Sequence, residues 1–230
     1  MRERMAQVLR TQQVAVFSLA KLAESRDTET GAHLERIRSY ARLIGTELAQ
    51  RGHYREMLTP DFIEEIYHSS PLHDIGKVGI LDEILLKPGR LTTEEFEVMK
   101  THTLIGGDTL RAADIEAGPE SFLAMGRDIA YYHHERWDGN GYPFGRCRTE
   151  IPIEARIVAV SDVYDALSSK RPYKVAFTHE KSKGIIVEGR GTFFDPAIVD
   201  AFLACEDEVL KIHSRLEDNG MGHAYGTKAQ

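Results

Sequence analysis

Apolar side chains along most of this chain recur at intervals of three and four residues, and strand-like alternation of apolar and polar residues is nearly absent. Intervals of three and four place side chains on one face of an α-helix, so this pattern constrains the fold more than any other feature. We therefore predict an all-α fold. The expected helices cover residues 7–23, 32–51, 60–70, 93–101, 121–133, 153–168 and 196–216.

Capping and turn residues mark the ends of the predicted helices. Thr59 followed by Pro60 is typical of a helix start, and Thr92 or Thr93 begins a capping box with the glutamates that follow. Pro71 is expected to interrupt or restart the third helix, and the dense turn residues of 138–143 separate two later helices. We expect a single domain over residues 1–230, with residues 1–23 as a lead-in helix and residues 219–230 as a frayed tail.

The charge and the apolar pattern exclude some classes of partner. The net charge is −7, whereas binding to a nucleic-acid polymer normally needs a concentrated basic face. No apolar run approaches the roughly 20 residues that cross a bilayer, and the opening MRERMAQVLR lacks the apolar stretch of a signal peptide. The two cysteines form neither a CxxC pair nor a disulfide framework. We therefore expect a cytoplasmic protein with no membrane and no nucleic-acid polymer among its partners.

Ten histidines in an acidic chain with two cysteines direct attention to imidazole metal sites. His73 and Asp74 follow an apolar segment with Lys77 close by, and burying such groups without a partner is costly. A metal ion would be that partner; the alternative is a buried hydrogen bond between His73 and Asp74, with Lys77 reaching solvent. Glu29 and His33 lie four residues apart and can face one centre, or they are an exposed capping carboxylate and an ordinary histidine.

Further histidines and carboxylates extend this set of candidate ligands. His102 is expected near the end of a helix. Because neighbouring helical residues diverge by roughly 100°, His133 and His134 would serve two different metals, or one metal and the substrate. Asp162 lies in an apolar helix, where a carboxylate is costly unless it is coordinated or paired. Asp165 is interpreted instead as a structural carboxylate that caps a helix or bridges an arginine.

Arg171 and Lys174 place two cations on a turn that Pro172 stiffens, and this turn is either a phosphate contact or a solvated surface turn. With it, the motifs of the chain resemble the signature set of the HD-GYP family, in the same order and over about residues 26–202. Asn140 stands where many members have threonine, and His68 occupies a position that is usually small and apolar; neither change removes a ligand. The matching segments are residues 29–33, 73–77, 102, 133–143, 162–167 and 171–174.

The resemblance implies a helical bundle of the HD superfamily with a metal centre in its core. It also implies a phosphodiesterase that hydrolyses cyclic di-GMP, a bacterial second messenger, to linear pGpG or onward to GMP. The implied catalytic residues are His73, Asp74 and Lys77. The implied substrate contacts are Lys77, Tyr142, Arg171 and Lys174. The implied metal ligands are Glu29, His33, His73, Asp74, His102, His133, His134 and Asp162.

Two metals would serve the chemistry of a phosphodiester. Held roughly 3.5–4 Å apart, they would position a bridging hydroxide in line with the bond and neutralise the charge that develops. Asp74 is the natural bridging carboxylate, and Glu29 is expected to complete a third metal position beside His33. The ligands are rich in imidazole and include no thiolate, which favours iron or manganese over magnesium and leaves zinc open.

Two other functions stay open at this point. One is a receptor or scaffold that binds a cyclic dinucleotide without turnover; the other is a phosphodiesterase for a mixed cyclic GMP-AMP dinucleotide. Family members usually follow a receiver or other sensor domain, so an upstream domain of that kind, or a diguanylate cyclase, is an expected partner in signal transduction. The opening helix is expected to join two copies of the chain as a homodimer.

Overall fold

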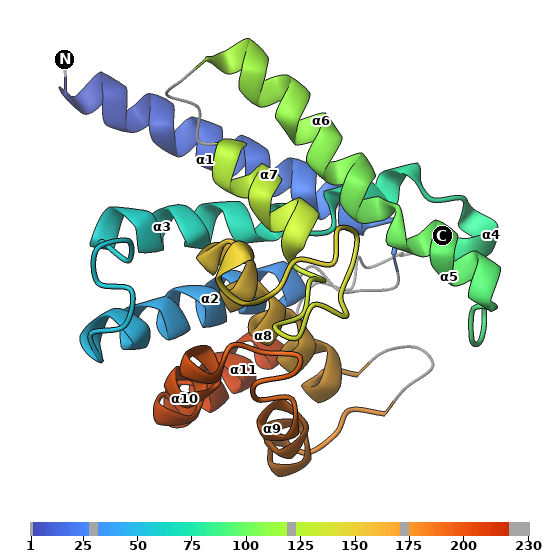
Figure 1. Ribbon diagram of the computed structural model, residues 1–230. Coiled ribbons are helices and arrows are strands. Elements are labelled where there is room, and N and C mark those ends of the chain that lie inside the picture. The colour runs from blue at the N-terminus through green and yellow to red at the C-terminus, as the bar shows by residue number, and fades with distance from the viewer. Residues whose placement is uncertain (1, 28–31, 119–122, 171–174, 221–230) are drawn as a thin grey trace, which may run out of the picture.

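The computed structural model describes residues 2–27, 32–118, 123–170 and 175–220, and over these ranges the chain is a bundle of helices (Figure 1). The described residues contain no strand, only an isolated bridge between Arg190 and Phe194. The predicted all-α class is confirmed. The α-helices are α1 (Arg2–Glu24), α2 (Ala32–Gln50), α3 (Pro60–Ser69), α4 (Asp82–Leu85), α5 (Thr93–Lys100), α6 (His102–Ala117), α7 (Leu123–Tyr132), α8 (Ile153–Ser168), α9 (His179–Glu188), α10 (Pro196–Ala204) and α11 (Glu206–Gly220), and the short 3-10 helices are η1 (Ser70–Leu72), η2 (Ile75–Gly79) and η3 (Arg148–Glu150).

Helix α2 lies at the centre of the main core, where α3, α8, α10 and α11 pack around it (Figure 1). Its side chains Ile37, Tyr40 and Ile44 are fully buried and stand at the intervals of three and four that predicted this helix. Helix α8 is buried on most of its surface, which explains why its sequence is apolar along almost its whole length. Within the described ranges, no helix has both the length and the apolar character needed to cross a membrane.

Helix α1 has one packed face and one exposed face. Val16, Phe17 and Ala20 pack against a small apolar cluster that includes Leu34 of α2 and Leu72 of η1. This contact fixes the C-terminal half of α1 against the rest of the fold. The opposite face carries large apolar side chains that are more than half exposed, namely Val8, Val14, Leu19 and Leu22.

Several predicted helix ends agree with the structure. The hydroxyl oxygens of Thr59 and Thr92 each accept a backbone N–H bond of 3.2 Å at the start of α3 and α5. Glu95 closes the capping box of α5. Pro71 lies in η1, the 3-10 turn that directly follows α3. The interruption or restart expected at this proline is therefore a short 3-10 helix that directly follows α3.

Other helix predictions were wrong or incomplete. Residues 196–216 do not form one helix, because the backbone of Cys205 (φ −109°, ψ 20°) leaves helical geometry between α10 and α11. The helix expected from about residue 93 to about 101 or beyond is two helices, α5 and α6. The adjacent glycines Gly106 and Gly107 weaken the helical signal of α6, since glycine is a poor helix former. Helix α9 was also missed.

Gly76 allows the segment after His73 to touch α6. A Cβ atom at residue 76 would lie 1.9 Å from the backbone oxygen of His102 and 2.5 Å from the backbone nitrogen of Gly106. Only glycine fits so close an approach of two backbones. The contact holds η2 against the start of α6 and so brings Asp74 close to His102.

Candidate metal centre

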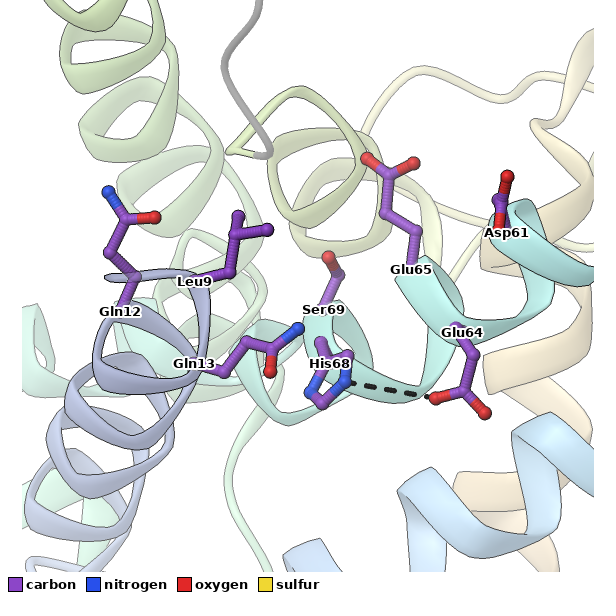
Figure 2. Close-up of a pocket in the computed structure, with 8 residues that line it drawn as sticks. All are labelled: Leu9, Gln12, Gln13, Asp61, Glu64, Glu65, His68 and Ser69. Atoms are coloured by element: carbon purple, nitrogen blue, oxygen red, sulfur yellow. Dashed lines mark ion pairs between the residues drawn. The ribbon is translucent and has the colours of Figure 1, made fainter. Parts of the chain in front are cut away.

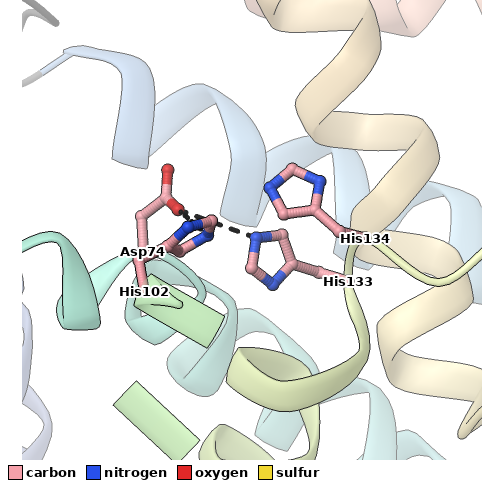
Figure 3. Close-up of side chains that lie close together, drawn as sticks. All are labelled: Asp74, His102, His133 and His134. Carbon is pink, nitrogen blue, oxygen red and sulfur yellow. Dashed lines mark ion pairs between the residues drawn. The ribbon is translucent and has the colours of Figure 1, made fainter. Parts of the chain in front are cut away.

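Every predicted metal ligand that the structure describes belongs to one of two groups at the centre of the fold. Each residue of a group offers one nitrogen or oxygen atom, and these atoms lie within 4.8 Å of one another. Figure 3 shows the first group, in which Asp74 faces the imidazole rings. The first group is Asp74, His102, His133 and His134, and the second is His33, His73 and Asp162.

The ends of helices supply most of these side chains. His33 lies in the first turn of α2, His73 directly follows η1, and His102 is the first residue of α6. His133 directly follows α7, while Asp162 lies in the interior of α8. Five separate elements therefore meet at one centre, and their packing sets the spacing of the ligand atoms.

The structure corrects two expectations about the histidines. His102 begins α6 instead of ending α5, which stops at Lys100. His133 and His134 do not diverge toward two metals, because α7 ends at Tyr132 and the helical rotation of about 100° no longer applies. Their ring centroids are 4.0 Å apart, and both belong to the first group.

Hydrogen bonds on the Nδ1 side orient four of the imidazole rings. A ring nitrogen that faces a carbonyl or carboxylate oxygen carries the proton, so Nε2 is the unprotonated nitrogen that faces the centre. Histidines that bind metals in proteins are held in this way. The Nδ1 to oxygen distances are 2.7 Å for His33 with Asp165, 2.9 Å for His73 with the Ser70 carbonyl, 2.7 Å for His102 with the Met99 carbonyl and 3.0 Å for His133 with the Ile129 carbonyl.

Asp165 is the structural carboxylate that the sequence predicted. It accepts hydrogen bonds from His33 Nδ1 and from the guanidinium of Arg36, whose Nη2 lies 2.9 Å from Asp165 Oδ2. Burial opposes charge on this carboxyl group, but His33 and Arg36 hold its pKa below the usual range. Asp165 therefore bridges an arginine and also fixes the orientation of a candidate ligand.

Buried acceptor atoms face one another in the centre. The Nε2 atoms of His73, His102 and His133 and the Oδ1 atom of Asp74 are buried and make no hydrogen bond. Two acceptors at close range repel unless a cation or a proton lies between them, and leaving such groups unpaired costs free energy. Divalent cations held by the two groups would satisfy these atoms, so the residues fit the metal centre that the family resemblance implies.

Asp74 belongs to the first group and also faces a histidine of the second. Its Oδ1 lies 3.1 Å from His102 Nε2 in the first group, and its Oδ2 lies 3.3 Å from His73 Nε2 in the second. Asp162 Oδ1 lies 3.9 Å from the Nε2 atoms of both His33 and His73. One carboxylate therefore stands between two sets of imidazoles, which is the geometry that a bridging ligand needs.

The pKa shifts of His133, His134 and Asp74 favour the protonation states that bind metals. Burial lowers the pKa of His133, and burial together with the neighbouring imidazoles of His133 and His102 holds the pKa of His134 well below its ordinary value. Burial opposes charge on Asp74, but Lys77 and His73 hold its pKa well below the usual range. Neutral imidazole and ionised carboxylate are the forms that coordinate metals.

Lys77 lies beside the shared carboxylate. Its Nζ is 2.8 Å from Asp74 Oδ2 and 2.7 Å from Asp27 Oδ2. The sequence predicts Lys77 as a phosphate contact, and this remains a prediction. Its two carboxylate neighbours keep the ammonium at the edge of the metal centre.

Three predicted site residues, Glu29, Arg171 and Lys174, lie outside the described residues. The sequence also failed to indicate Glu24, whose Oε1 lies 3.8 Å from His33 Nε2. Glu24 is the last residue of α1, and no motif marks it. Only the packing of α1 against the rest of the fold brings this carboxylate to the centre.

Two hollows of the described structure differ in their fitness for an anionic substrate. A hollow of about 300 Å³ opens beside the first group, and Tyr142, a predicted substrate contact, lines it and stacks on His134 at 4.7 Å between ring centroids. A hollow of about 530 Å³ lies between α1 and α3 (Figure 2), but Asp61, Glu64 and Glu65 line it. Carboxylates repel a phosphodiester anion, and no lysine or arginine lines the larger hollow. The smaller hollow has one carboxylate, Glu135, together with the cations Lys100 and Arg136, which favours it as the place for such an anion.

Known proteins share this sequence over most of its length. The chain is 52% identical over 212 residues to a cyclic di-GMP phosphodiesterase of Vibrio cholerae, covering 92% of this chain and 43% of that protein. It is 42% identical over 212 residues to a cyclic di-GMP phosphodiesterase of Thermotoga maritima, covering 92% of this chain and 54% of that protein. It is 36% identical over 214 residues to 3'3'-cGAMP-specific phosphodiesterase 2 of Vibrio cholerae, covering 93% of this chain and 38% of that protein. The chain thus spans about half, or less, of the length of these relatives.

Solved structures share the fold at low sequence identity. The crystal structure of a cyclic GMP-AMP specific phosphodiesterase of V. cholerae superposes with a TM-score of 0.60 and 17% identity, covering 90% of this chain and 53% of that one. An HDG"Y"P protein from Bdellovibrio bacteriovorus gives a TM-score of 0.54 and 14% identity, covering 86% and 62%. Residues 18–198 match the sequence profile of the HD domain. The chain therefore belongs to the HD domain family, and the HD-GYP assignment made from its motifs is confirmed.

Proposed function

We propose that the chain is a metal-dependent phosphodiesterase that hydrolyses cyclic di-GMP to linear pGpG. The observation that carries this proposal is the position of Asp74, whose two oxygens face histidines of both groups at 3.1 and 3.3 Å. Such a shared carboxylate suits a pair of metals acting on one phosphodiester. The relatives named cyclic di-GMP phosphodiesterases support both the reaction class and the substrate.

The two groups would hold two divalent ions, with Asp74 between them. When bound, the ions supply a nucleophile and neutralise the charge that builds on the phosphoryl oxygens. The protein contributes neutral imidazoles whose rings are fixed through Nδ1, so that ligand geometry need not be reorganised during the reaction. Iron or manganese suits these nitrogen and oxygen ligands.

Local cations complete the proposed phosphate site. A chain with a net charge of −7 needs them to hold an anionic substrate. Lys77 Nζ lies 2.8 Å from Asp74 Oδ2, so a phosphate bound by Lys77 would sit beside the shared carboxylate. Arg171 and Lys174 belong to the same proposal. Glu29 is proposed as an oxygen ligand for a third ion beside His33, which would assist onward hydrolysis of pGpG to GMP.

A mixed cyclic GMP-AMP dinucleotide is the second candidate substrate. The relative named as 3'3'-cGAMP-specific, at 36% identity over 93% of this chain, favours it. A receptor without turnover has less support, because a degenerate site would have lost ligands. Here the described predicted ligands all remain within the two groups.

We infer further that α1 pairs with α1 of a second copy. Val8, Leu19 and Leu22 are more than half exposed and stand on one helical face with Gln12 and Ala15, which are also exposed. The intervals between these five positions are four, three, four and three, as in the seam of a coiled coil. A seam of this kind is complementary to itself, so a second copy of the same helix fits it.

Substitution at the shared carboxylate tests the proposed function. His73→Ala or Asp74→Ala should lose bound metal and hydrolysis of cyclic di-GMP together, measured by elemental analysis and by chromatography of the products. Arg171→Ala should weaken hydrolysis and keep the metals. Full metal occupancy with full activity in Asp74→Ala would show that the reaction does not depend on this centre.

A further inference from the structure

The hollow beside the first group has an aromatic wall. It is lined by Phe96 of α5, Tyr142 and Phe193, together with His133 and His134 of the candidate metal centre. Phe96 and Phe193 are 44% and 49% exposed, so both rings can be reached from the hollow. The rings of Phe96 and Tyr142 meet edge to face, with centroids 6.3 Å apart. Exposed aromatic rings beside a phosphate-processing centre are suitable surfaces for stacking a nucleobase.

A lysine stands at this aromatic wall. Lys100 Nζ lies 5.0 Å from the centroid of the Phe96 ring and 5.5 Å from that of Tyr142. Its ion pair with Glu97 is on the surface, and the Glu97 side chain is 62% exposed. Such pairs contribute little to stability, so Lys100 can exchange this partner for a ligand at small cost.

Arg136, the other basic residue that lines the hollow, is already held by other side chains. Arg136 makes two hydrogen bonds to Asp138, of 3.1 and 2.6 Å, and its guanidinium lies 3.4 Å from the centroid of the Phe193 ring. These contacts hold the Arg136 guanidinium in place and leave it less available to a ligand. Lys100 is therefore the better placed of the two to bind a polar edge of a base.

A lysine can distinguish guanine from adenine by the hydrogen bonds that it donates. Guanine presents two neighbouring acceptors, N7 and O6, whereas adenine presents N7 next to an amino donor. An ammonium group donates to both guanine acceptors and meets an unfavourable donor on adenine. We propose that the hollow binds one guanine base of the substrate, with Phe96 and Tyr142 as its aromatic contacts and Lys100 as the donor to O6 and N7. This inference rests on the proposed function, because it places the base next to the metals that would act on its phosphate.

Substitution of Lys100 by methionine tests the inference. Lys100→Met removes the donor and keeps a long side chain on α5, and kcat/KM is measured for cyclic di-GMP and cyclic di-AMP. We expect kcat/KM for cyclic di-GMP to fall roughly 5- to 150-fold, the range of one specific base contact, and kcat/KM for cyclic di-AMP to fall much less. Lys211→Met is the matched control, because Lys211 pairs with Glu208 three residues before it, as Lys100 does with Glu97, but lies on α11. The control should change neither value.

An equal fall in kcat/KM for both dinucleotides would overturn the inference, because it would show that Lys100 binds a phosphate. An unchanged kcat/KM for both would overturn it as well. Binding of GMP and AMP, measured by calorimetry, separates this inference from the proposed function, since it needs no turnover. We expect the protein to bind GMP more tightly than AMP and Lys100→Met to abolish this preference. Phe96→Leu should weaken the binding of both nucleotides to the same degree. If the unaltered protein hydrolyses no cyclic dinucleotide yet keeps this preference, the proposed function fails and the guanine site stands.

Discussion

Replacing Asp165 with asparagine should weaken metal binding as well as folding stability. Asp165 is 1% exposed and accepts hydrogen bonds from His33 Nδ1 and from Arg36, which is itself 4% exposed. Asparagine keeps the shape of the side chain but leaves the buried guanidinium without a counter-charge. Breaking a buried pair in this way costs about 3–5 kcal/mol of unfolding free energy. Because asparagine still offers one acceptor oxygen, we expect a value near the lower limit.

The effect on metal binding follows from the orientation of His33. Without the carboxylate, the proton on His33 Nδ1 and the angle of its ring are less firmly fixed, and loss of such an outer contact typically weakens metal affinity roughly 10- to 100-fold. The low pKa of Asp165 means that its stabilising effect is fully present above the pKa of an unfolded aspartate and is lost only as the pH falls through the folded value. The comparison at pH 7 therefore measures the whole contribution of the charge.

Asp195→Asn is the matched control. Asp195 is also buried, pairs with the buried guanidinium of Arg156 and accepts a hydrogen bond from Tyr54, and none of these residues belongs to the two candidate groups. Urea unfolding should show a comparable loss of stability in both variants, whereas a competition assay with a metal chelator should show weaker binding only in Asp165→Asn. Equal metal affinity in the two variants would refute the role of Asp165 in positioning His33.

Three further results are expected. Gly76→Ala should lower stability and metal content, because its Cβ would meet the His102 backbone oxygen at 1.9 Å, whereas Gly184→Ala, with no neighbour within 4 Å, should keep both; equal metal content would contradict this. Burial raises the pKa of Glu154 to about 7, so the cost of ionising this buried side chain develops as the pH rises from the ordinary pKa of a glutamate toward 7, and the gain in urea resistance of Glu154→Gln over the parent should be much larger at pH 8 than at pH 5. Leu19→Glu should convert a dimer to a monomer in sedimentation, and a parent chain that is already monomeric would rule out pairing through α1.

Much of the fold could be predicted because its helices have clear local signals. Ile37, Tyr40 and Ile44 mark the buried face of α2 by their spacing, and Thr59 caps α3 through a bond that the sequence already suggests. The break at Cys205 has no such signal, because apolar residues continue at helical spacing across it. Local spacing predicts a helix wherever the apolar period persists, and only packing decides where the backbone turns.

The candidate site was predictable as a set of residues but not as an arrangement. The motifs around His73 and Asp162 indicate ligands, yet the joint placement of His133 and His134 depends on where α7 ends. Glu24 could not be found from its neighbours in sequence, since α1 must first pack against the bundle to bring it within 3.8 Å of His33 Nε2. Side chains that reach a site through the packing of separate elements carry no local signature.

We propose that two metal ions, held on either side of Asp74, would act together on a cyclic dinucleotide. The most direct measurement strips the protein of metal, adds back Mn²⁺ or Fe²⁺ stepwise without oxygen, and follows bound ions per chain and cleavage of cyclic di-GMP in the same samples. We predict that cleavage stays near background up to one bound ion per chain and rises as the second binds, and that Asp74→Ala stays inactive throughout. Full cleavage with one ion per chain, or cleavage that survives complete removal of metal, would contradict the account.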